Sequence, residues 1–197
     1  MERKMPDLKM YLVPVLLILV AALIAYIAFM PSVPCAGCNA KVGFVFSPHS
    51  EQQVVDFIGS AQKSVDIEMY TFSSDAMMSA VGDAIKRGVH VRIIMEPRVE
   101  DSRKQKVFDT LAALGAEMRW ASLEYKLTHS KFVIVDGKKV LLGSINFSKS
   151  ALNDNREADA TIEGDGVKEI VGIFETDWAI ATKAIGGNAS GQGAAAE

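Results

Sequence analysis

Short apolar runs and amphipathic stretches alternate along most of the chain. Apolar runs rich in β-branched residues indicate buried strands, and apolar residues spaced three or four apart indicate helices. This pattern predicts strands at 42–46, 64–70, 90–95, 117–120, 132–135, 140–142 and 158–162, and helices at 50–61, 74–87, 101–114 and 167–183. Because strands and helices alternate, we expect an α/β fold with a partly parallel sheet that is covered on both faces.

The amino-terminal part has a different pattern. No charged residue occurs from Met10 to Ala40, and Tyr11–Met30 is almost wholly apolar. A helix of about 20 apolar residues matches the hydrocarbon thickness of a bilayer, so residues 10–30 are predicted to form a single-pass transmembrane anchor after a tail at 1–9. A cleaved signal peptide and a buried core helix are the alternatives.

Charges that flank the apolar run suggest its orientation. Arg3, Lys4 and Lys9 precede it, and no basic residue follows it before Lys41. By the positive-inside rule the amino terminus is then cytoplasmic, which in a prokaryote places the rest of the chain on the non-cytoplasmic side.

Three further segments complete the predicted organisation. Residues 31–40 form a linker that carries Cys35 and Cys38, residues 41–184 form the folded domain, and the Gly- and Ala-rich residues 185–197 are expected to be disordered. The Cys-x-x-Cys spacing suits half of a zinc site shared by two chains, a disulfide, or two cysteines without a special role.

The overall charge limits the classes of partner. The chain has 197 residues and a net charge of −3, which excludes a generally basic surface for nucleic acid. Any contact with a polyanion must therefore be local. Four basic residues follow the strand at 90–95, and a solvated mixed face is favoured over a phosphate-binding patch because acidic residues interrupt them: Arg98, Arg103, Lys104 and Lys106.

The stretch His129–Asn146 contains the strongest candidate chemistry. Asp136-Gly137 separates two apolar runs and predicts a hairpin with a two-residue turn, in which Val135 faces Lys138. Continued along the strands, this register places His129 opposite Ser144. Side chains two apart share a face of a strand, so Lys131 and Asn146 are expected beside them. Asp136 is expected in the turn, at the other end of the hairpin.

These side chains suit a phosphodiester. A histidine can attack phosphorus or move protons near neutral pH, and Lys131 and Asn146 can hold the non-bridging oxygens. The full spacing, His129-x-Lys131-x4-Asp136-x6-Gly143-Ser144-x-Asn146, resembles the HKD signature of the phospholipase D superfamily at every fixed position. Asn155-Arg156-Glu157 is similar to the N-x-E that often follows it.

The resemblance covers residues 41–184 and implies an α/β/α sandwich around a mixed sheet. Chain length and the apolar amino terminus look most like the short members, which are single-motif endonucleases and the mitochondrial cardiolipin hydrolase/piRNA-pathway nuclease group. Members of this superfamily combine two HKD motifs in one site, and this chain has one. The resemblance therefore implies a homodimer in which His129 of each subunit meets across a two-fold axis.

The resemblance also assigns roles. One His129 forms a phosphohistidine and the other protonates the leaving alcohol, Lys131 and Asn146 hold the oxygens, Ser144 adds a hydrogen bond, and Glu157 orients an imidazole. Asp136 belongs to the signature and is expected to stabilise the turn. No metal or cofactor is implied. Lys126, just before the motif, is placed to bind substrate.

Three functions are consistent with these residues. A membrane-anchored, metal-independent endonuclease is favoured, because the flanking loops 98–106 and 122–128 are mostly polar. A phospholipase or cardiolipin hydrolase is the alternative, and a catalytically silent membrane scaffold is the third. Of the other histidines, His49 is a candidate to line the groove and His90 is expected to be structural.

Overall fold

The computed structural model describes residues 9–29 and 40–183, which fall into two compact units at Met1–Cys35 and Ala36–Glu197. The sequence predictions for the amino-terminal tail, most of the Cys-x-x-Cys linker and the carboxyl-terminal tail lie outside the described residues.

The first unit contains one helix, α1 (Lys9–Phe29), with Pro14 in its second turn. The side chains of residues 14–26 in this helix are exposed. Among the residues that the structure describes, no helix is both long enough and apolar enough to qualify as a membrane span.

The second unit is built on a seven-stranded mixed sheet in the order β1-β7-β6-β5-β2-β3-β4. Strands β2, β3 and β4 are parallel, and the remaining neighbours are antiparallel. The bounds of the strands are β1 (Lys41–Phe46), β2 (Ser64–Met69), β3 (His90–Met95), β4 (Glu117–Trp120), β5 (Lys131–Val135), β6 (Lys139–Gly143) and β7 (Ala158–Glu163). The predicted partly parallel sheet is confirmed.

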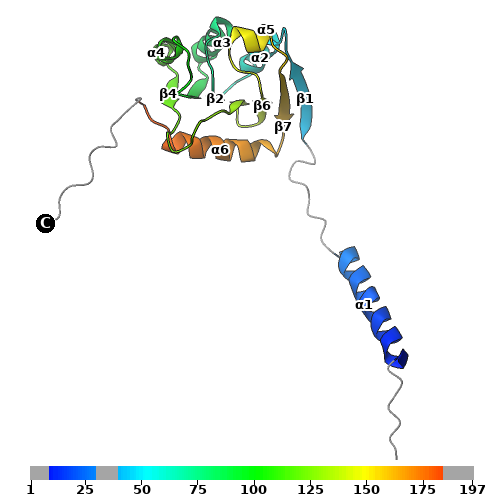
Figure 1. Cartoon of the computed structure of the whole chain (residues 1–197). Coiled ribbons are helices and arrows are strands. Elements are labelled where there is room, and N and C mark those ends of the chain that lie inside the picture. The colour runs from blue at the N-terminus through cyan, green and yellow to red at the C-terminus, as the bar shows by residue number, and fades with distance from the viewer. Residues whose placement is uncertain (1–8, 30–39, 184–197) are drawn as a thin grey trace, which may run out of the picture. The chain divides into compact units, whose positions relative to one another are not determined.

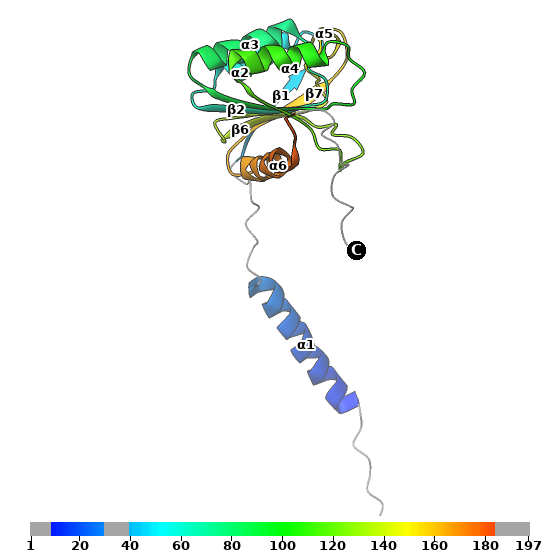
Figure 2. The same cartoon turned by 90° about the vertical axis from the view of Figure 1, so that its left-hand side faces the viewer.

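Helices cover both faces of this sheet (Figures 1 and 2). The helices α2 (Glu51–Gly59), α3 (Asp75–Lys86) and α4 (Lys104–Leu114) lie on one face, and α6 (Val167–Ile180) lies alone on the other. Each face has its own apolar core: a large one centred on Ile67, Ile93 and Val133, and a smaller one in which Ile134 and Val140 pack with Phe174 and Trp178 of α6. The expected α/β/α sandwich is thus confirmed for the folded unit, and one short helix that the pattern missed, α5 (Lys149–Asn153), follows β6.

The central hairpin differs from its predicted register by one residue. Val135 pairs with Lys139 and Phe132 with Leu142, so Lys138 belongs to the turn. Asp136 and Gly137 both have positive φ, and Lys138 N donates to Val135 O at 3.0 Å. A turn of this length moves every residue of β6 one step along β5. The predicted pairing of Val135 with Lys138 is therefore wrong, and so is the placing of Ser144 directly opposite His129.

Candidate active site

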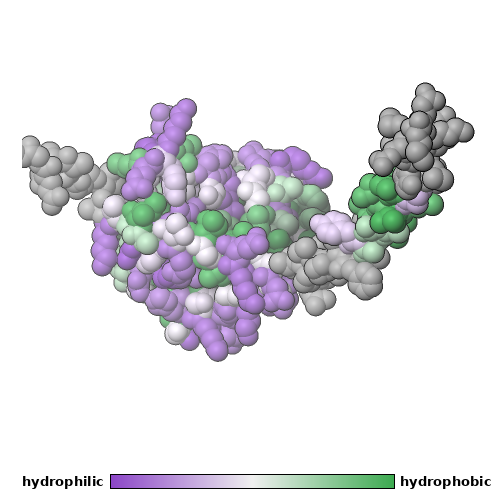
Figure 3. All heavy atoms as spheres, turned by 90° about the horizontal axis from the view of Figure 1, so that it is seen from below, coloured by the Kyte–Doolittle hydropathy of each residue, from purple (hydrophilic) through white to green (hydrophobic). Residues whose placement is uncertain are grey.

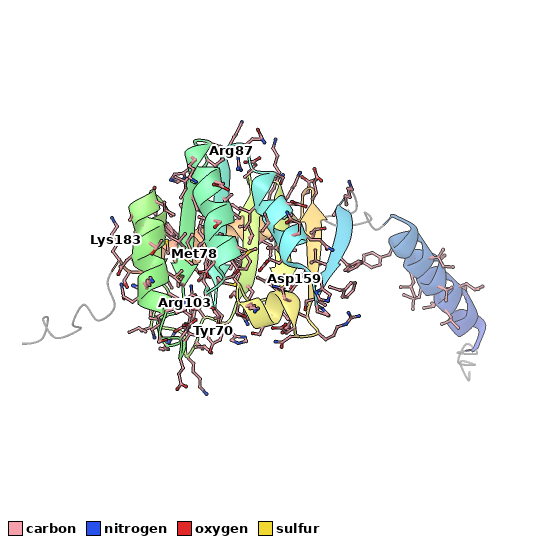
Figure 4. All side chains as sticks on the ribbon, turned by 90° about the horizontal axis from the view of Figure 1, so that it is seen from above. Tyr70, Met78, Arg87, Arg103, Asp159 and Lys183 are labelled. Atoms are coloured by element: carbon pink, nitrogen blue, oxygen red, sulfur yellow. The ribbon has the colours of Figure 1, made fainter. Side chains whose placement is uncertain are left out.

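The candidate site lies at one end of the sheet, where β2 and β6 end and β5 and β7 begin. Met69 pairs with Lys131 and Gly143 pairs with Asp159, so the segments that leave these four strands meet there. In Figure 4, Tyr70, which directly follows β2, lies at the opposite edge of the domain from Arg87.

His129 is exposed and is held by two neighbouring side chains. The Lys131 Nζ lies 3.2 Å from His129 Nδ1 and donates to the His129 carbonyl at 2.6 Å. The Tyr70 ring packs 4.4 Å from the imidazole, centroid to centroid, and Lys131 Nζ lies 5.0 Å from the same Tyr70 ring. Among the described residues no group is bonded to Nε2, so this is the ring nitrogen that can reach a substrate.

Lys131 is a buried cation, with a relative exposure of 6%. Burial lowers the pKa of its ammonium group, and the carboxylates of Glu157 and Asp159 oppose this shift. The structure thus brings His129 and Lys131 together, as predicted, and keeps two acids within electrostatic range of the lysine.

Asn146 joins the site through the segment that follows β2. Its Oδ1 accepts a hydrogen bond from Thr71 N at 3.2 Å, which fixes the orientation of the amide. In the described part of the chain nothing is bonded to its Nδ2, so two donors remain for the oxygens of a substrate.

Ser144 and Glu157 form a separate pair at the start of β7. Ser144 Oγ donates to Glu157 Oε2 at 2.6 Å, and Asn155 Nδ2 donates to Glu157 Oε1 at 3.2 Å. The buried Ser47, which the sequence gave no reason to select, accepts a hydrogen bond from Glu157 N and donates to the Asn155 carbonyl. No bond between Glu157 and His129 occurs within the described chain, so the predicted orienting contact is not present within one subunit.

Asp159 is a site residue that sequence reasoning missed. Its carboxylate is buried and accepts from Ile145 N at 3.0 Å, which holds the turn after β6. Burial raises the pKa of Asp159, although hydrogen bonds from the Ile145 and Ser144 backbones lower it. A Cβ on Gly143 would lie 2.2 Å from Asp159 Oδ1, which is why glycine is required there. The signal that could have found it is an acidic residue, Asp159, at a buried position of the strand β7.

Asp136 lies at the far end of β5, as predicted. Its carboxylate accepts hydrogen bonds from the backbone nitrogens of Gln62, Lys63 and Ser64 at 2.7–3.1 Å. Burial alone would raise its pKa, but these bonds outweigh burial and the pKa lies below its ordinary value. Asp136 therefore stabilises the turn against the start of β2.

The loop before His129 is held by a buried acid. Glu96 has no solvent exposure and accepts hydrogen bonds from Thr128 N, from Arg98 N and from the Arg98 guanidinium. The guanidinium also donates to the carbonyls of Ser122, Tyr125 and Lys126. Neither residue was selected from the sequence as holding this loop, because the partners are distant along the chain.

The contacts of the neighbouring basic residues support the favoured mixed face over a phosphate-binding patch. Arg98 is bonded to Glu96, Arg103 pairs with Asp75, and Lys104 Nζ donates to the carbonyls of Pro97 and Val99. The mixed-face alternative therefore describes these residues better. Lys126 is exposed in the loop three residues before His129.

The two other histidines lie apart from these contacts. His90 begins β3 and its Nε2 lies 2.7 Å from Glu117 Oε1 in an exposed pair. His49 has a positive φ in the loop after β1. Within the described residues, no cluster of three or more His, Cys, Asp or Glu side chains is placed to hold a metal ion.

Comparisons with known proteins agree with this geometry. Residues 54–178 match the family described as cardiolipin synthase, PLD-like domain. The chain is 32% identical over 133 residues to a phospholipase D of Rickettsia bellii, covering 64% of this chain and 62% of that protein. It is 29% identical over 122 residues to a mitochondrial cardiolipin hydrolase of Chlamydomonas reinhardtii, covering 61% of this chain and 54% of that protein. The match thus covers between one half and two thirds of each of these relatives.

Solved structures show the same fold. Nuc from Salmonella typhimurium, a phospholipase D family member, superposes with a TM-score of 0.68 at 27% identity, covering 72% of this chain and 96% of that one. NucT from Helicobacter pylori superposes with a TM-score of 0.66 at 22% identity, covering 73% and 98% respectively, which supports the fold alone.

Proposed function

We propose, from the premise that this chain belongs to the PLD-like domain family of the phospholipase D superfamily, that it hydrolyses phosphodiesters through a phosphohistidine on His129. The observation that carries the proposal is the cluster of His129, Lys131 and Tyr70 at the end of the sheet, with the amide of Asn146 on the adjoining segment. An exposed imidazole beside a buried cation is suited to attack phosphorus while charge builds on the oxygens.

A homodimer would complete the site. One chain supplies one histidine, whereas the reaction needs a nucleophile and a proton donor. In the proposed first step, His129 attacks phosphorus, the bond to the leaving oxygen breaks, and His129 of the partner subunit gives that oxygen a proton. In the second step, a water loses a proton to the partner's His129 and displaces the phosphoryl group from the first imidazole. Lys131 and Asn146 hold the non-bridging oxygens in both steps.

A phospholipid is the substrate class that the surroundings of His129 support best. Exposed apolar side chains stand around the site on the loop before β5 and on α6: Leu123, Tyr125, Leu127 and Ile173. Three of the four basic residues that a phosphate-binding patch would have used are bonded within the protein, and two relatives are named for lipid hydrolysis.

Nucleic acid remains the second candidate, as an endonuclease reaction. The exposed Lys126, three residues before His129, favours it. So do Lys131 and Asn146, because side chains that hold only the phosphate oxygens of a nucleic acid do not distinguish its bases. The likeness to Nuc, of which the match covers nearly the whole length, adds support.

Although α1 as described does not qualify as a membrane span, the uncharged run Tyr11–Met30, which extends beyond it, is proposed to anchor the enzyme to a membrane, with the catalytic domain on the non-cytoplasmic side in a prokaryote. The uncharged run Tyr11–Met30 and the basic residues before it support this orientation. The orientation is measured by adding protease to intact and to permeabilised cells. We expect the domain to be cleaved in intact cells; cleavage only after permeabilisation would reverse the assignment.

The proposed reaction is tested with the full chain purified in detergent. In the presence of EDTA, the wild type, His129→Ala and the matched control His90→Ala are each assayed on phospholipid vesicles, single-stranded DNA and RNA. We expect turnover in the wild type and the control and none in His129→Ala. In the wild type, an acid-labile, base-stable phosphoryl group that still carries the remaining alcohol of the diester should be trapped on the protein. Equal turnover in both variants would exclude His129 as the nucleophile, and turnover of nucleic acid alone would reverse the order of substrates.

A further inference from the structure

A pocket of about 280 Å³ opens beside His129, between the loop before β5 and helix α6. Glu68 at the end of β2 and Asp177 on α6 contribute its two carboxyl groups, and Tyr125 and Ile173 contribute its aromatic and aliphatic walls. Figure 3 views the α6 face, where hydrophobic and hydrophilic residues are interleaved over the domain. None of the steps proposed above uses Glu68 or Asp177.

Glu68 is a buried acid without a compensating partner. Its side chain has no exposed surface, and within residues 9–29 and 40–183 neither Oε atom has a hydrogen-bond partner. Burial raises the pKa of Glu68 to about 7; the Ser130 hydroxyl lowers it and the nearby Asp177 carboxyl raises it further. A buried carboxyl that makes no bond destabilises a fold, so the packing of this domain does not by itself account for an acid at position 68.

A neighbouring pair shows how the fold treats an acid in the same setting. Asp66 lies two residues before Glu68 on β2, so the two side chains face α6 from the same side of the sheet. Arg92 lies between Asp66 and Glu175 of α6 and bonds both carboxylates, at 2.7 and 2.6 Å. Glu68 and Asp177 repeat this arrangement of an acid on β2 and an acid on α6, but no lysine or arginine of the described chain lines their pocket.

The titratable groups that face this pocket are therefore three potential anions and His129. Asp177 raises the pKa of the Tyr125 phenol, chiefly through its negative charge, and both residues line the pocket. Such a pocket repels a second phosphate of a substrate. It suits a small cation that donates several hydrogen bonds and can lie against an aromatic ring.

We propose that the pocket formed by Glu68, Asp177 and Tyr125 is a subsite for a primary ammonium group carried on the alcohol of the diester that reacts at His129. The proposal rests on the phosphodiesterase function above and names its substrate class as diesters of an amino alcohol. The ammonium donates to the carboxyl groups of Glu68 and Asp177, and its short carbon chain lies against Tyr125, which places the phosphorus near His129.

Direct binding tests the subsite independently of any reaction. Ethanolamine is titrated into the full chain by calorimetry, with ethylene glycol as a neutral ligand of the same size. We expect ethanolamine to bind and ethylene glycol not to bind. Glu68→Gln and Asp177→Asn should each weaken ethanolamine binding at least tenfold, whereas the exposed Glu169→Gln on the same helix leaves it unchanged. Circular dichroism of each variant confirms that it is folded.

Turnover then distinguishes a lipid from a soluble source of the amine. Vesicles of phosphatidylethanolamine and of phosphatidylglycerol are compared with soluble glycerophosphoethanolamine. Preference for either amino-alcohol diester over phosphatidylglycerol, reduced at least tenfold in Glu68→Gln, supports the subsite and identifies its source. No ethanolamine binding by the wild type, or equal binding by Glu68→Gln, overturns the proposal even if phosphodiesters are hydrolysed. Ethanolamine binding without turnover of any diester would refute the proposed phosphodiesterase function, while the ammonium-binding subsite would still stand.

Discussion

Replacing Glu96 by glutamine should loosen the loop that presents His129 to the substrate. The carboxylate accepts one hydrogen bond from Thr128 N, one residue before His129, and three from Arg98. Glutamine keeps one oxygen and puts an NH2 group where the other oxygen was. That group faces N–H donors, so at least one buried hydrogen bond is lost and the charge attraction to Arg98 disappears.

The magnitude follows from burial. Removing one partner of a buried ion pair typically costs about 3–5 kcal/mol. Arg98 is 31% exposed and still donates to three carbonyls, so part of this cost is recovered through water and those bonds. We therefore expect Glu96→Gln to lower the free energy of unfolding by about 2–3 kcal/mol at pH 7. Because a misplacement of about 1 Å at a catalytic group can cost about 100-fold, kcat/KM should fall roughly 10- to 100-fold.

Urea unfolding followed by tryptophan fluorescence measures the stability, since both tryptophans, Trp120 and Trp178, lie in the folded domain. Burial raises the pKa of Glu96, but its hydrogen bonds to Arg98 and Thr128 outweigh burial and lower the pKa below 4.5. The stabilising contribution is therefore present above pH 4.5 and is lost as the pH falls through the folded-state pKa. The difference between wild type and variant should shrink on acidification, and the exposed Glu100→Gln is the control. A difference below about 0.5 kcal/mol at pH 7 would refute this account of the loop.

Three further predictions concern the fold around the site. Asp136→Asn should cost about 2 kcal/mol in urea unfolding, because three backbone donors lose a charged acceptor, whereas the exposed Asp165→Asn should cost less than about 0.5; equal costs would contradict this. Gly143→Ala should lower stability by about 3 kcal/mol or more, since its Cβ meets backbone at 2.4 Å, whereas Gly172→Ala has open space in α6 and should stabilise by about 0.5–1 kcal/mol; a neutral Gly143→Ala would contradict the close approach. Since folding raises the pKa of Glu68 from 4.5 to about 7, its contribution to stability is fully present below pH 4.5 and is lost as the pH rises through 7. Glu68→Gln should therefore be more stable than wild type at pH 8 and gain less at pH 4.5, and a difference independent of pH would contradict the burial of that acid.

The order and type of the elements could be predicted from the sequence, because they depend on local pattern. Alternation in Ser64–Met69 and His90–Met95, and helical spacing in Asp75–Lys86, each lie within a few neighbouring residues. The hairpin at Asp136-Gly137 and the chemistry of His129 and Lys131 were likewise visible, because the motif is contiguous.

The register of the hairpin and the pairing of its side chains depend on contacts with residues that are distant in the sequence. Asp136 adopts a positive φ while its carboxylate is fixed by the backbone of residues 62–64, and this contact with another strand accompanies the one-residue shift of the hairpin. The same shift takes Ser144 away from His129 and toward Glu157. A local turn rule cannot include such a contact, because the partner is more than seventy residues away.

The sequence by itself therefore determined which elements form, and which side chains could act on a phosphodiester. Only the tertiary structure decided which charges neutralise one another and which do not. Arg98 pairs with Glu96 instead of standing free for phosphate, and Asp66 meets Arg92, whereas Glu68 meets Asp177 across the α6 face. The physical reason is that electrostatic compensation depends on distance and burial in three dimensions, and these are set by the packing of segments that lie far apart in the chain.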